Sequence, residues 1–414
     1  MALTQLRRGR GSTVSAAGGT IDVTRPLGVY VHFPFCSVRC PYCDFAVDTR
    51  AAIPHEAYAD ALIAELAARG SWFRAPPAAP PELRSVYFGG GTPGLWRPDA
   101  LGRVLEAARR AFEGPAADRL EVTVEANPGE VSAEHLVALR RAGVNRLSFG
   151  LQAFQDELLE VLGRNHRAAA GPAVMEAARA AGFDNVSCDL MFGVPGQSLD
   201  EWRRSIEALV ALKPEHVSAY ALTVERGTPY FNLERRGRLP RPDDEAAAAM
   251  FIWARDALAA AGFAHYEVSS HARLGRRSIH NGLYWSGAAY LGLGASAASF
   301  RPLADGSGVR FSNPRATDSY LRDPSPAHVE HRRPDALENE ALWLSLRTAD
   351  GVDRVAHAGR HGHDPLTRSG RAEAAARCRE AGWLEVTPDA VRLTPAGFLF
   401  ADEVASRLWS DGPW

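Results

Sequence analysis

The chain has 414 residues, of which 46% are hydrophobic and 23% charged, and its formal net charge is −2. This length suits a large α/β unit with a smaller second domain, and the near-neutral charge argues against a nucleic-acid-binding field over the whole molecule. The five cysteines make no disulfide framework, and the sequence has no run of about 18 apolar residues. We therefore expect a cytoplasmic protein without a membrane span and without nucleic acid as a partner.

Strand-like and helical stretches alternate along the first half of the chain. Each strand-like run is short and apolar, and a longer amphipathic stretch separates it from the next. This alternation predicts a parallel sheet with right-handed crossovers, arranged as a partial (β/α)6 TIM-like barrel over residues 27–225. The chemistry of such barrels lies at the carboxyl ends of the strands. The predicted strands are 28–32, 85–88, 120–125, 146–150, 186–192 and 216–222.

The flanking segments have different patterns. Residues 1–26 lack the apolar core of a secretory signal, and we interpret them as a flexible tail. Residues 226–300 predict a β-rich extension of the barrel, and residues 301–334 a linker. Residues 335–414 combine helices with a β-hairpin, which predicts a winged-helix-like domain. Because acidic residues outnumber arginines in that domain, we expect it to pack against the barrel or to act as a lid rather than to bind DNA.

Three cysteines follow the first predicted strand with the spacing C-x3-C-x2-C: Cys36, Cys40 and Cys43. Three thiolates this close can hold three irons of a [4Fe–4S] cluster and leave the fourth iron open to a small molecule. A zinc site is the alternative, but zinc usually takes four ligands from two C-x2-C pairs, and the sequence has no second pair. We therefore predict an iron–sulfur cluster on these three residues.

Further motifs follow the predicted strands in a fixed order. They are segments 30–36, 89–93, 125–128, 146–152, 163–166, 189–197 and 280–285. With the cysteines, they make the chain resemble the radical S-adenosylmethionine (SAM) family from about residue 27 to 408. Within that family it is similar to the coproporphyrinogen-oxidase-like branch, which includes haem chaperones. The resemblance implies a radical SAM barrel with a [4Fe–4S] cluster, bound SAM and an external reductant for the cluster.

The resemblance also assigns residues to SAM. A glycine-rich turn lets the backbone approach the methionyl group, because no side chain stands in the way. Carboxylates suit the ribose hydroxyls and the methionyl ammonium, and an arginine can pair with the SAM carboxylate. For each residue alone, a salt bridge or a strand cap at the barrel mouth is the alternative. The predicted SAM residues are Tyr30, Tyr42, Gly90, Gly91, Thr92, Glu125, Gln152, Arg164 and Asp189.

Two functions compete under this resemblance. One is a haem chaperone that binds haem and transfers it to haemoproteins; the other is an oxygen-independent coproporphyrinogen III oxidase that makes protoporphyrinogen IX by radical decarboxylation. The oxidases have a further cysteine where this chain has Phe45. Segment 280–285 resembles the H-N-x-x-Y-W haem motif of the chaperones, and an imidazole can ligate haem iron. We therefore predict a haem chaperone in which His280 binds haem. A purely structural role is the alternative for His280, and a radical SAM methylase is a third candidate function.

Two features stay outside this assignment. The histidine-rich segment 356–363 has no helical i, i+4 pair with a nearby acid, and we interpret it as a surface loop. Because many acceptors of such chaperones are respiratory proteins, the resemblance implies a peripheral membrane contact, although no amphipathic basic helix requires one.

Overall fold

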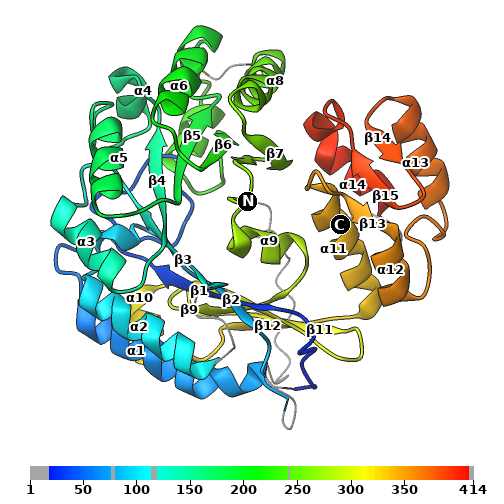
Figure 1. Ribbon diagram of the computed structural model, residues 1–414, viewed down its shortest axis with the longest axis horizontal. Coiled ribbons are helices and arrows are strands. Elements are labelled where there is room, and N and C mark those ends of the chain that lie inside the picture. The colour runs from blue at the N-terminus through cyan, green and yellow to red at the C-terminus, as the bar shows by residue number, and fades with distance from the viewer. Residues whose placement is uncertain (1–17, 76–79, 113–118, 241–242, 410–414) are drawn as a thin grey trace.

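The computed structural model describes residues 18–75, 80–112, 119–240 and 243–409. A twelve-stranded sheet runs in the order β12-β11-β10-β9-β1-β2-β3-β4-β5-β6-β8-β7, and a three-stranded sheet lies in the C-terminal domain. The large sheet curves round helix α9 (Ile279–Trp285; Figure 1), and its two edge strands, β12 and β7, do not pair with each other within the described ranges. The result is a partial barrel.

Six neighbouring parallel strands form the barrel that the sequence predicted, and helices cover their outer face (Figure 1). Covered on both faces, these strands are buried almost throughout. The strands are β1 (Leu27–Phe33), β2 (Leu83–Gly90), β3 (Glu121–Ala126), β4 (Arg146–Gln152), β5 (Val186–Phe192) and β6 (His216–Ala221). The helices are α1 (His55–Arg69), α2 (Pro98–Ala111), α3 (Ala133–Arg141), α4 (Asp156–Val161), α5 (Ala170–Ala180) and α6 (Leu199–Ala211).

Local sequence signals set several helix boundaries. α6 begins at a capping box, in which the Ser198 hydroxyl accepts the Glu201 N–H and the Glu201 carboxylate accepts the Ser198 N–H. The sequence pattern missed α5, because Gly171 and Pro172 resemble a chain break. Proline is tolerated in a first helical turn, where its missing N–H is not needed. None of the described helices is both long and apolar enough to cross a membrane.

The region 226–300 adds strands to both edges of the barrel sheet. On one side β8 pairs antiparallel with β6 and β7 with β8; on the other, β9 pairs parallel with β1 and β10 antiparallel with β9. Helix α9 lies on the inner side of the sheet (Figure 1) and contacts β1, β2 and β9. These elements are α7 (Pro229–Arg235), α8 (Asp244–Ala260), β7 (Ala264–Glu267), β8 (Ser270–Ala272), α9 (Ile279–Trp285), β9 (Ala289–Leu293) and β10 (Ala298–Pro302).

The prediction of a linker at residues 301–334 is wrong, because this segment continues the sheet. It holds β11 (Gly308–Ser312), α10 (Thr317–Arg322) and β12 (His328–Arg332), and β11 pairs antiparallel with both β10 and β12. Each strand has five residues, and in β11 only Val309 and Phe311 are buried apolar side chains. An alternation of buried and exposed side chains over only five residues is hard to distinguish from a loop in the sequence.

The expectation of a flexible tail fails for residues 18–26, while residues 1–17 lie outside the described part of the chain. Ile21 forms a β-bridge with Leu303. The buried Arg301 guanidinium donates to the carbonyls of Gly18 and Gly19 at 3.0 and 3.1 Å. This segment is therefore anchored to the β10–β11 hairpin.

The C-terminal domain has its own apolar core and the winged-helix order of elements. It docks on β7 and the turn after it: the Val268 N–H donates to the Arg347 carbonyl at 2.9 Å, and the Phe398 ring lies 4.6 Å from the His265 ring. Its elements are α11 (Pro334–Leu346), β13 (Val352–Asp353), α12 (Arg354–His361), α13 (Arg371–Glu380), β14 (Leu384–Val386), β15 (Ala390–Leu393) and α14 (Ala401–Leu408).

The junction of β9 and β10 leaves no room for a side chain at Gly292, where a Cβ would lie 2.1 Å from the Ala298 carbonyl oxygen. We expect Gly292→Ala to lower the free energy of unfolding by about 1–3 kcal/mol through overpacking. In the control Gly282→Ala, nothing lies within 4 Å of the added Cβ in helix α9. Thermal unfolding of both variants tests this, and equal melting temperatures would contradict it.

Candidate functional site

The three cysteines of the C-x3-C-x2-C segment lie on the loop that follows β1, and all three are free and half-buried. Burial raises the pKa of the Cys36 thiol to about 11 and also raises that of Cys43, and the neighbouring thiols add to both shifts. Cys188 and Cys378 are buried in two separate apolar cores. The loop therefore offers three thiols and no fourth cysteine, which is a donor set that fits a [4Fe–4S] cluster with one open iron.

The turn after β2 packs directly against the start of this loop. The N–H groups of Gly91 and Thr92 donate to the carbonyls of Phe33 and Phe35 at 2.8 and 2.9 Å. A Cβ on Gly91 would lie 2.8 Å from the Phe35 carbonyl oxygen, and Gly90 has a φ of 111°, which side chains rarely allow. These glycines thus have a structural role in seating the loop, besides the role in SAM binding predicted for them.

A hydrogen-bond network joins two of the thiols to the barrel strands. Thr92 Oγ1 donates to Cys36 Sγ at 3.5 Å and accepts from Asn127 Nδ2 at 3.1 Å. The Arg164 guanidinium donates to Cys40 Sγ at 3.7 Å and to the side-chain oxygen of Asn127. Asn127 therefore connects Thr92 to Arg164, both of which were predicted to bind SAM. The sequence analysis missed this role of Asn127. Its position just beyond the third strand was the available signal.

Two carboxyl groups face the inside of the barrel: Glu125 near the end of β3 and Asp189 in the middle of β5. Glu125 accepts the Tyr87 hydroxyl at 2.7 Å and the Gly90 N–H at 3.2 Å, and Asp189 accepts the Ser148 hydroxyl at 3.2 Å. Burial, with the nearby Asp189 charge, raises the pKa of Glu125 to about 7. Burial likewise raises the pKa of Asp189. Two neighbouring carboxyl groups with raised pKa values are typical of a ligand site.

Gln152 ends β4 in a strained conformation. Its φ is 65°, in the left-handed region that a non-glycine residue seldom adopts, and the β4–β5 register shifts between Gly150 and Gln152. Its side chain has no hydrogen-bond partner among the described residues. A bulge of this kind turns a side chain in a new direction and often lies beside a functional site.

The two predicted tyrosines occupy different places. Tyr30 is on β1, with its hydroxyl 3.2 Å from His32 Nδ1 and its ring stacked 6.2 Å from that of Tyr87. Tyr42 is on the cysteine loop, where its ring lies 6.3 Å from that of Tyr230 in α7. Tyr30 thus faces the barrel interior, and Tyr42 faces the helical cover of the loop.

Arg146, at the start of β4, is a residue whose role the sequence analysis missed. It is 2% exposed, its nearest carboxylate oxygen belongs to Glu121 at 4.0 Å, and its Nε has no hydrogen-bond partner in the described ranges. Its charge opposes the upward pKa shifts of Glu125 and Asp189. Residues 146, 148 and 150 alternate onto one strand face, and that spacing was the signal for an inward-facing arginine.

His280 lies in α9 and is 1% exposed. Its Nδ1 is 2.8 Å from the Ser85 hydroxyl and its Nε2 is 2.9 Å from the Tyr284 hydroxyl, while its ring stacks 4.9 Å from that of Tyr87. Burial lowers the pKa of His280 to about 3, so the imidazole is neutral. Both ring nitrogens are thus already engaged, and neither is directed at an open space.

The structure therefore divides the predicted residues between two ends of the barrel interior. His280 contacts Gly28 and Ser85, near the amino ends of β1 and β2, away from the cysteine loop. The remaining residues lie in the middle or at the carboxyl ends of the strands, on the segments that follow β2 and α4, or on the cysteine loop. This second group comprises Tyr30, Cys36, Cys40, Tyr42, Cys43, Gly90, Gly91, Thr92, Glu125, Gln152, Arg164 and Asp189.

Comparison with known proteins gives consistent matches along the chain. Residues 30–209 match the Radical SAM superfamily, and residues 333–400 match the HemN C-terminal domain. The heme chaperone HemW of Bacillus subtilis is 36% identical over 91% of this chain and 97% of its own length. The bovine mitochondrial radical S-adenosyl methionine domain-containing protein 1 is 39% identical over 78% of this chain and 74% of its own.

Among solved structures, the coproporphyrinogen III oxidase HemN of Escherichia coli, a radical SAM enzyme, is similar in fold. The TM-score is 0.78, with 21% sequence identity over 95% of this chain and 92% of that one. At this identity the likeness supports the predicted fold class and carries no information on activity.

The cysteine loop makes a direct prediction. We expect Cys36→Ala to abolish cluster assembly, because two thiolates cannot replace the three-thiolate set. Cys378→Ala, which removes a buried thiol from the C-terminal core, should retain the cluster. Iron and sulfide analysis with electron paramagnetic resonance (EPR) after anaerobic reconstitution measures both. A full cluster in Cys36→Ala would refute the assignment.

The raised pKa of Glu125 predicts a pH dependence of stability in the cluster-free protein. The folded state holds a proton that the unfolded state releases, so the free energy of unfolding should fall as pH rises from 4.5 to about 7. Glu125→Gln has no proton to release and should not show this loss. Between pH 4 and pH 8, the free energy of unfolding of wild type should therefore fall by about 3 kcal/mol more than that of the variant. Denaturant unfolding at both pH values, with the exposed Glu157→Gln as control, checks it. Parallel pH profiles of wild type and Glu125→Gln would contradict the prediction.

Proposed function

The chain belongs to the HemW family of radical SAM proteins, and on that premise we propose that it is a haem chaperone, which binds haem and delivers it to acceptor haemoproteins. The observation that carries the proposal is the extent of the match: 36% identity to a heme chaperone over 91% of this chain. The match covers the barrel, its extension and the C-terminal domain together.

The cysteine loop and the barrel interior support the cofactors of this family. Cys36, Cys40 and Cys43 would hold the cluster, whose open iron and reducing electron supply the chemistry at the SAM sulfonium. Thr92 and Arg164 hold the loop by their hydrogen bonds to sulfur. The other predicted SAM residues, listed above, would bind and orient SAM at the carboxyl ends of the strands.

The oxidase remains the second candidate. Its support is the match of residues 333–400 to the HemN C-terminal domain. Against it stands Phe45, which occupies the place of the oxidases' additional cysteine. The Phe45 side chain is 46% exposed on the cysteine loop, so it is not needed there for packing. The chaperone therefore has the better support.

The proposed function includes partners and a cellular location. An external electron donor reduces the cluster, haemoproteins accept the haem, and a peripheral membrane encounter brings the chain to respiratory acceptors. A cytoplasmic location is supported by the cysteines, all five of which are free thiols, as a reducing compartment would keep them.

One experiment separates the two candidates. The cluster-reconstituted protein is incubated anaerobically with SAM, dithionite and coproporphyrinogen III, and haem is titrated into a parallel sample. We expect stoichiometric haem uptake and no protoporphyrinogen IX. Decarboxylated product would overturn the chaperone in favour of the oxidase, and absence of haem binding would remove the chaperone altogether.

A further inference from the structure

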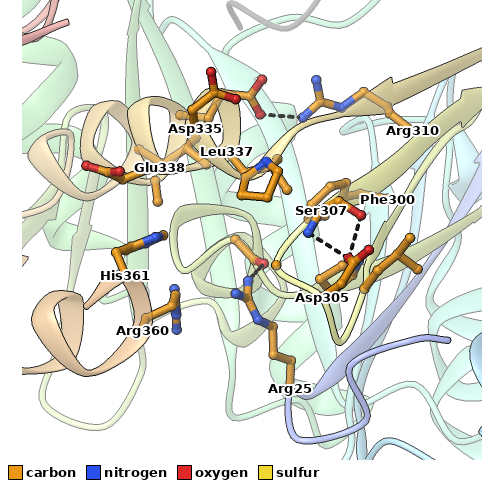
Figure 2. Close-up of a pocket in the computed structure, with 18 of the residues that line it drawn as sticks. Arg25, Phe300, Asp305, Ser307, Arg310, Asp335, Leu337, Glu338, Arg360 and His361 are labelled. Carbon is orange, nitrogen blue, oxygen red and sulfur yellow. Dashed lines mark hydrogen bonds and ion pairs between the residues drawn. The ribbon is translucent and has the colours of Figure 1, made fainter. Parts of the chain in front are cut away.

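A cavity of about 290 Å³ lies between the barrel extension and the C-terminal domain. One wall is formed by the end of α9 and the β10–β11 hairpin, and the other by α11 and the end of α12. Figure 2 shows Arg25, Arg360 and His361 on the same side of this space. Tyr284, whose hydroxyl bonds His280, also lines the cavity, whereas His280 does not.

His361 presents an open imidazole to the cavity. Its ring packs 4.5 Å from that of His357, and no described residue forms a hydrogen bond or ion pair with it. Burial, and then the neighbouring His357, lowers the pKa of His361 to about 4, so the ring is neutral near pH 7. A neutral imidazole with a free nitrogen is a common metal ligand. His280 differs, because both of its ring nitrogens are engaged.

The same side of the cavity carries positive charge. Arg360 has no hydrogen-bond or ion-pair partner within the described ranges. Arg25 donates to the Gly287 carbonyl at 2.6 Å and pairs with Asp22 at 3.2 Å. Burial and the charge of Arg360 lower the pKa of Arg25, so the two cations act on each other across this space. A bound anion would relieve that repulsion.

The carboxylates around the cavity do not fill this role, because each is already bonded. Glu338 pairs with Arg371 and Arg368, and Glu340 with Arg310 and Arg332. Asp335 pairs with Arg333, and Asp305 accepts the N–H and hydroxyl of Ser307. Among the described residues, none of these carboxylates pairs with Arg360, so its guanidinium is available to a bound anion.

The remaining lining is apolar and aromatic. Tyr284, Tyr290 and Phe300 come from the barrel extension, and Leu337 and Leu344 come from α11. Flat aromatic faces and leucine side chains suit a macrocycle with one apolar body and a charged edge.

We propose that this cavity is a haem site, in which His361 ligates the iron and Arg360, with Arg25, binds the propionate carboxylates. The inference rests on the proposed chaperone function and names the site where its cargo is held. A volume of about 290 Å³ is at the lower end for ligand pockets, so haem enters by one edge and stays partly exposed. Partial exposure suits a carrier that must release its cargo.

A free metal ion is the competing occupant of this region. Glu338, His357 and His363 place ligand atoms within 4.8 Å of one another. The two guanidinium groups on Glu338 oppose a cation there, so this cluster functions as an ion-pair network. The interpretation of segment 356–363 as a surface loop is wrong: residues 354–361 form α12, which holds His357 and His361 one turn apart.

Haem titration of the full-length chain, followed by its Soret absorbance and EPR, tests the site. His361→Ala should weaken haem binding by roughly tenfold or more, since even outer-shell losses at metal sites cost that much. His331→Ala, at an exposed histidine on β12, should bind as wild type does. His361→Cys should give the spectrum of a thiolate-ligated ferric haem, a change that loss of a structural contact would not produce.

The propionate contact has its own variant pair. Arg360→Glu should weaken haem binding, whereas Arg379→Glu makes the same charge change at an exposed position on α13 and should not. Melting temperature and cluster content of each variant verify folding.

The outcomes distinguish the two levels of inference. If wild type binds haem but His361→Ala and Arg360→Glu bind it equally well, this site is refuted while the chaperone function stands. Loss of haem confined to His280→Ala would have the same meaning. If wild type binds no haem, the proposed function itself fails.

Discussion

The close approach of the β2 turn to the cysteine loop is the contact on which the rest of the site depends. Two backbone hydrogen bonds hold the loop against the turn after β2. The loop can approach this closely because Gly91 has no Cβ. The loop has no regular secondary structure between β1 and α1, so it could not hold three thiols in place unaided. Thr92, next in the chain, then bonds the Cys36 sulfur. The first cysteine is therefore positioned by the sheet.

The barrel interior shows why this arrangement suits a charged cofactor. Glu125 and Asp189 are half-buried with raised pKa values, and the buried Arg146 lies near them without a close carboxylate partner. Buried groups so imperfectly paired lower the stability of the fold, and such a cost is typical of binding sites. A ligand with an ammonium and a carboxylate, as SAM has, matches both signs of charge. His280 stays neutral at the opposite end, as a packed side chain beneath this polar layer.

Docking of the C-terminal domain creates a second environment with different chemistry. The domain contacts the barrel at β7 through main-chain hydrogen bonds and aromatic packing, and this brings α11 and α12 over α9 and the β10–β11 hairpin (Figure 1). Tyr284 belongs to both environments, since its hydroxyl bonds His280 and its ring lines the cavity. Tyr284 thus links the barrel interior to the interdomain cavity.

The sequence alone determined the features that depend on neighbours along the chain. The spacing of Cys36, Cys40 and Cys43 predicted the three-thiol loop, and the β–α alternation predicted the parallel strands, because both patterns are local. Only the tertiary structure decided which distant residues meet. The sequence could not show that β11 and β12 extend the sheet, that Asn127 joins Thr92 to Arg164, or that both nitrogens of His280 are engaged. It also could not show that His361, Arg360 and Arg25 line the same cavity, since more than 330 residues separate Arg25 from the other two in the chain. Contacts between residues far apart in the chain depend on how the strands pair and how the domains dock. The spacing of residues along the sequence predicts neither.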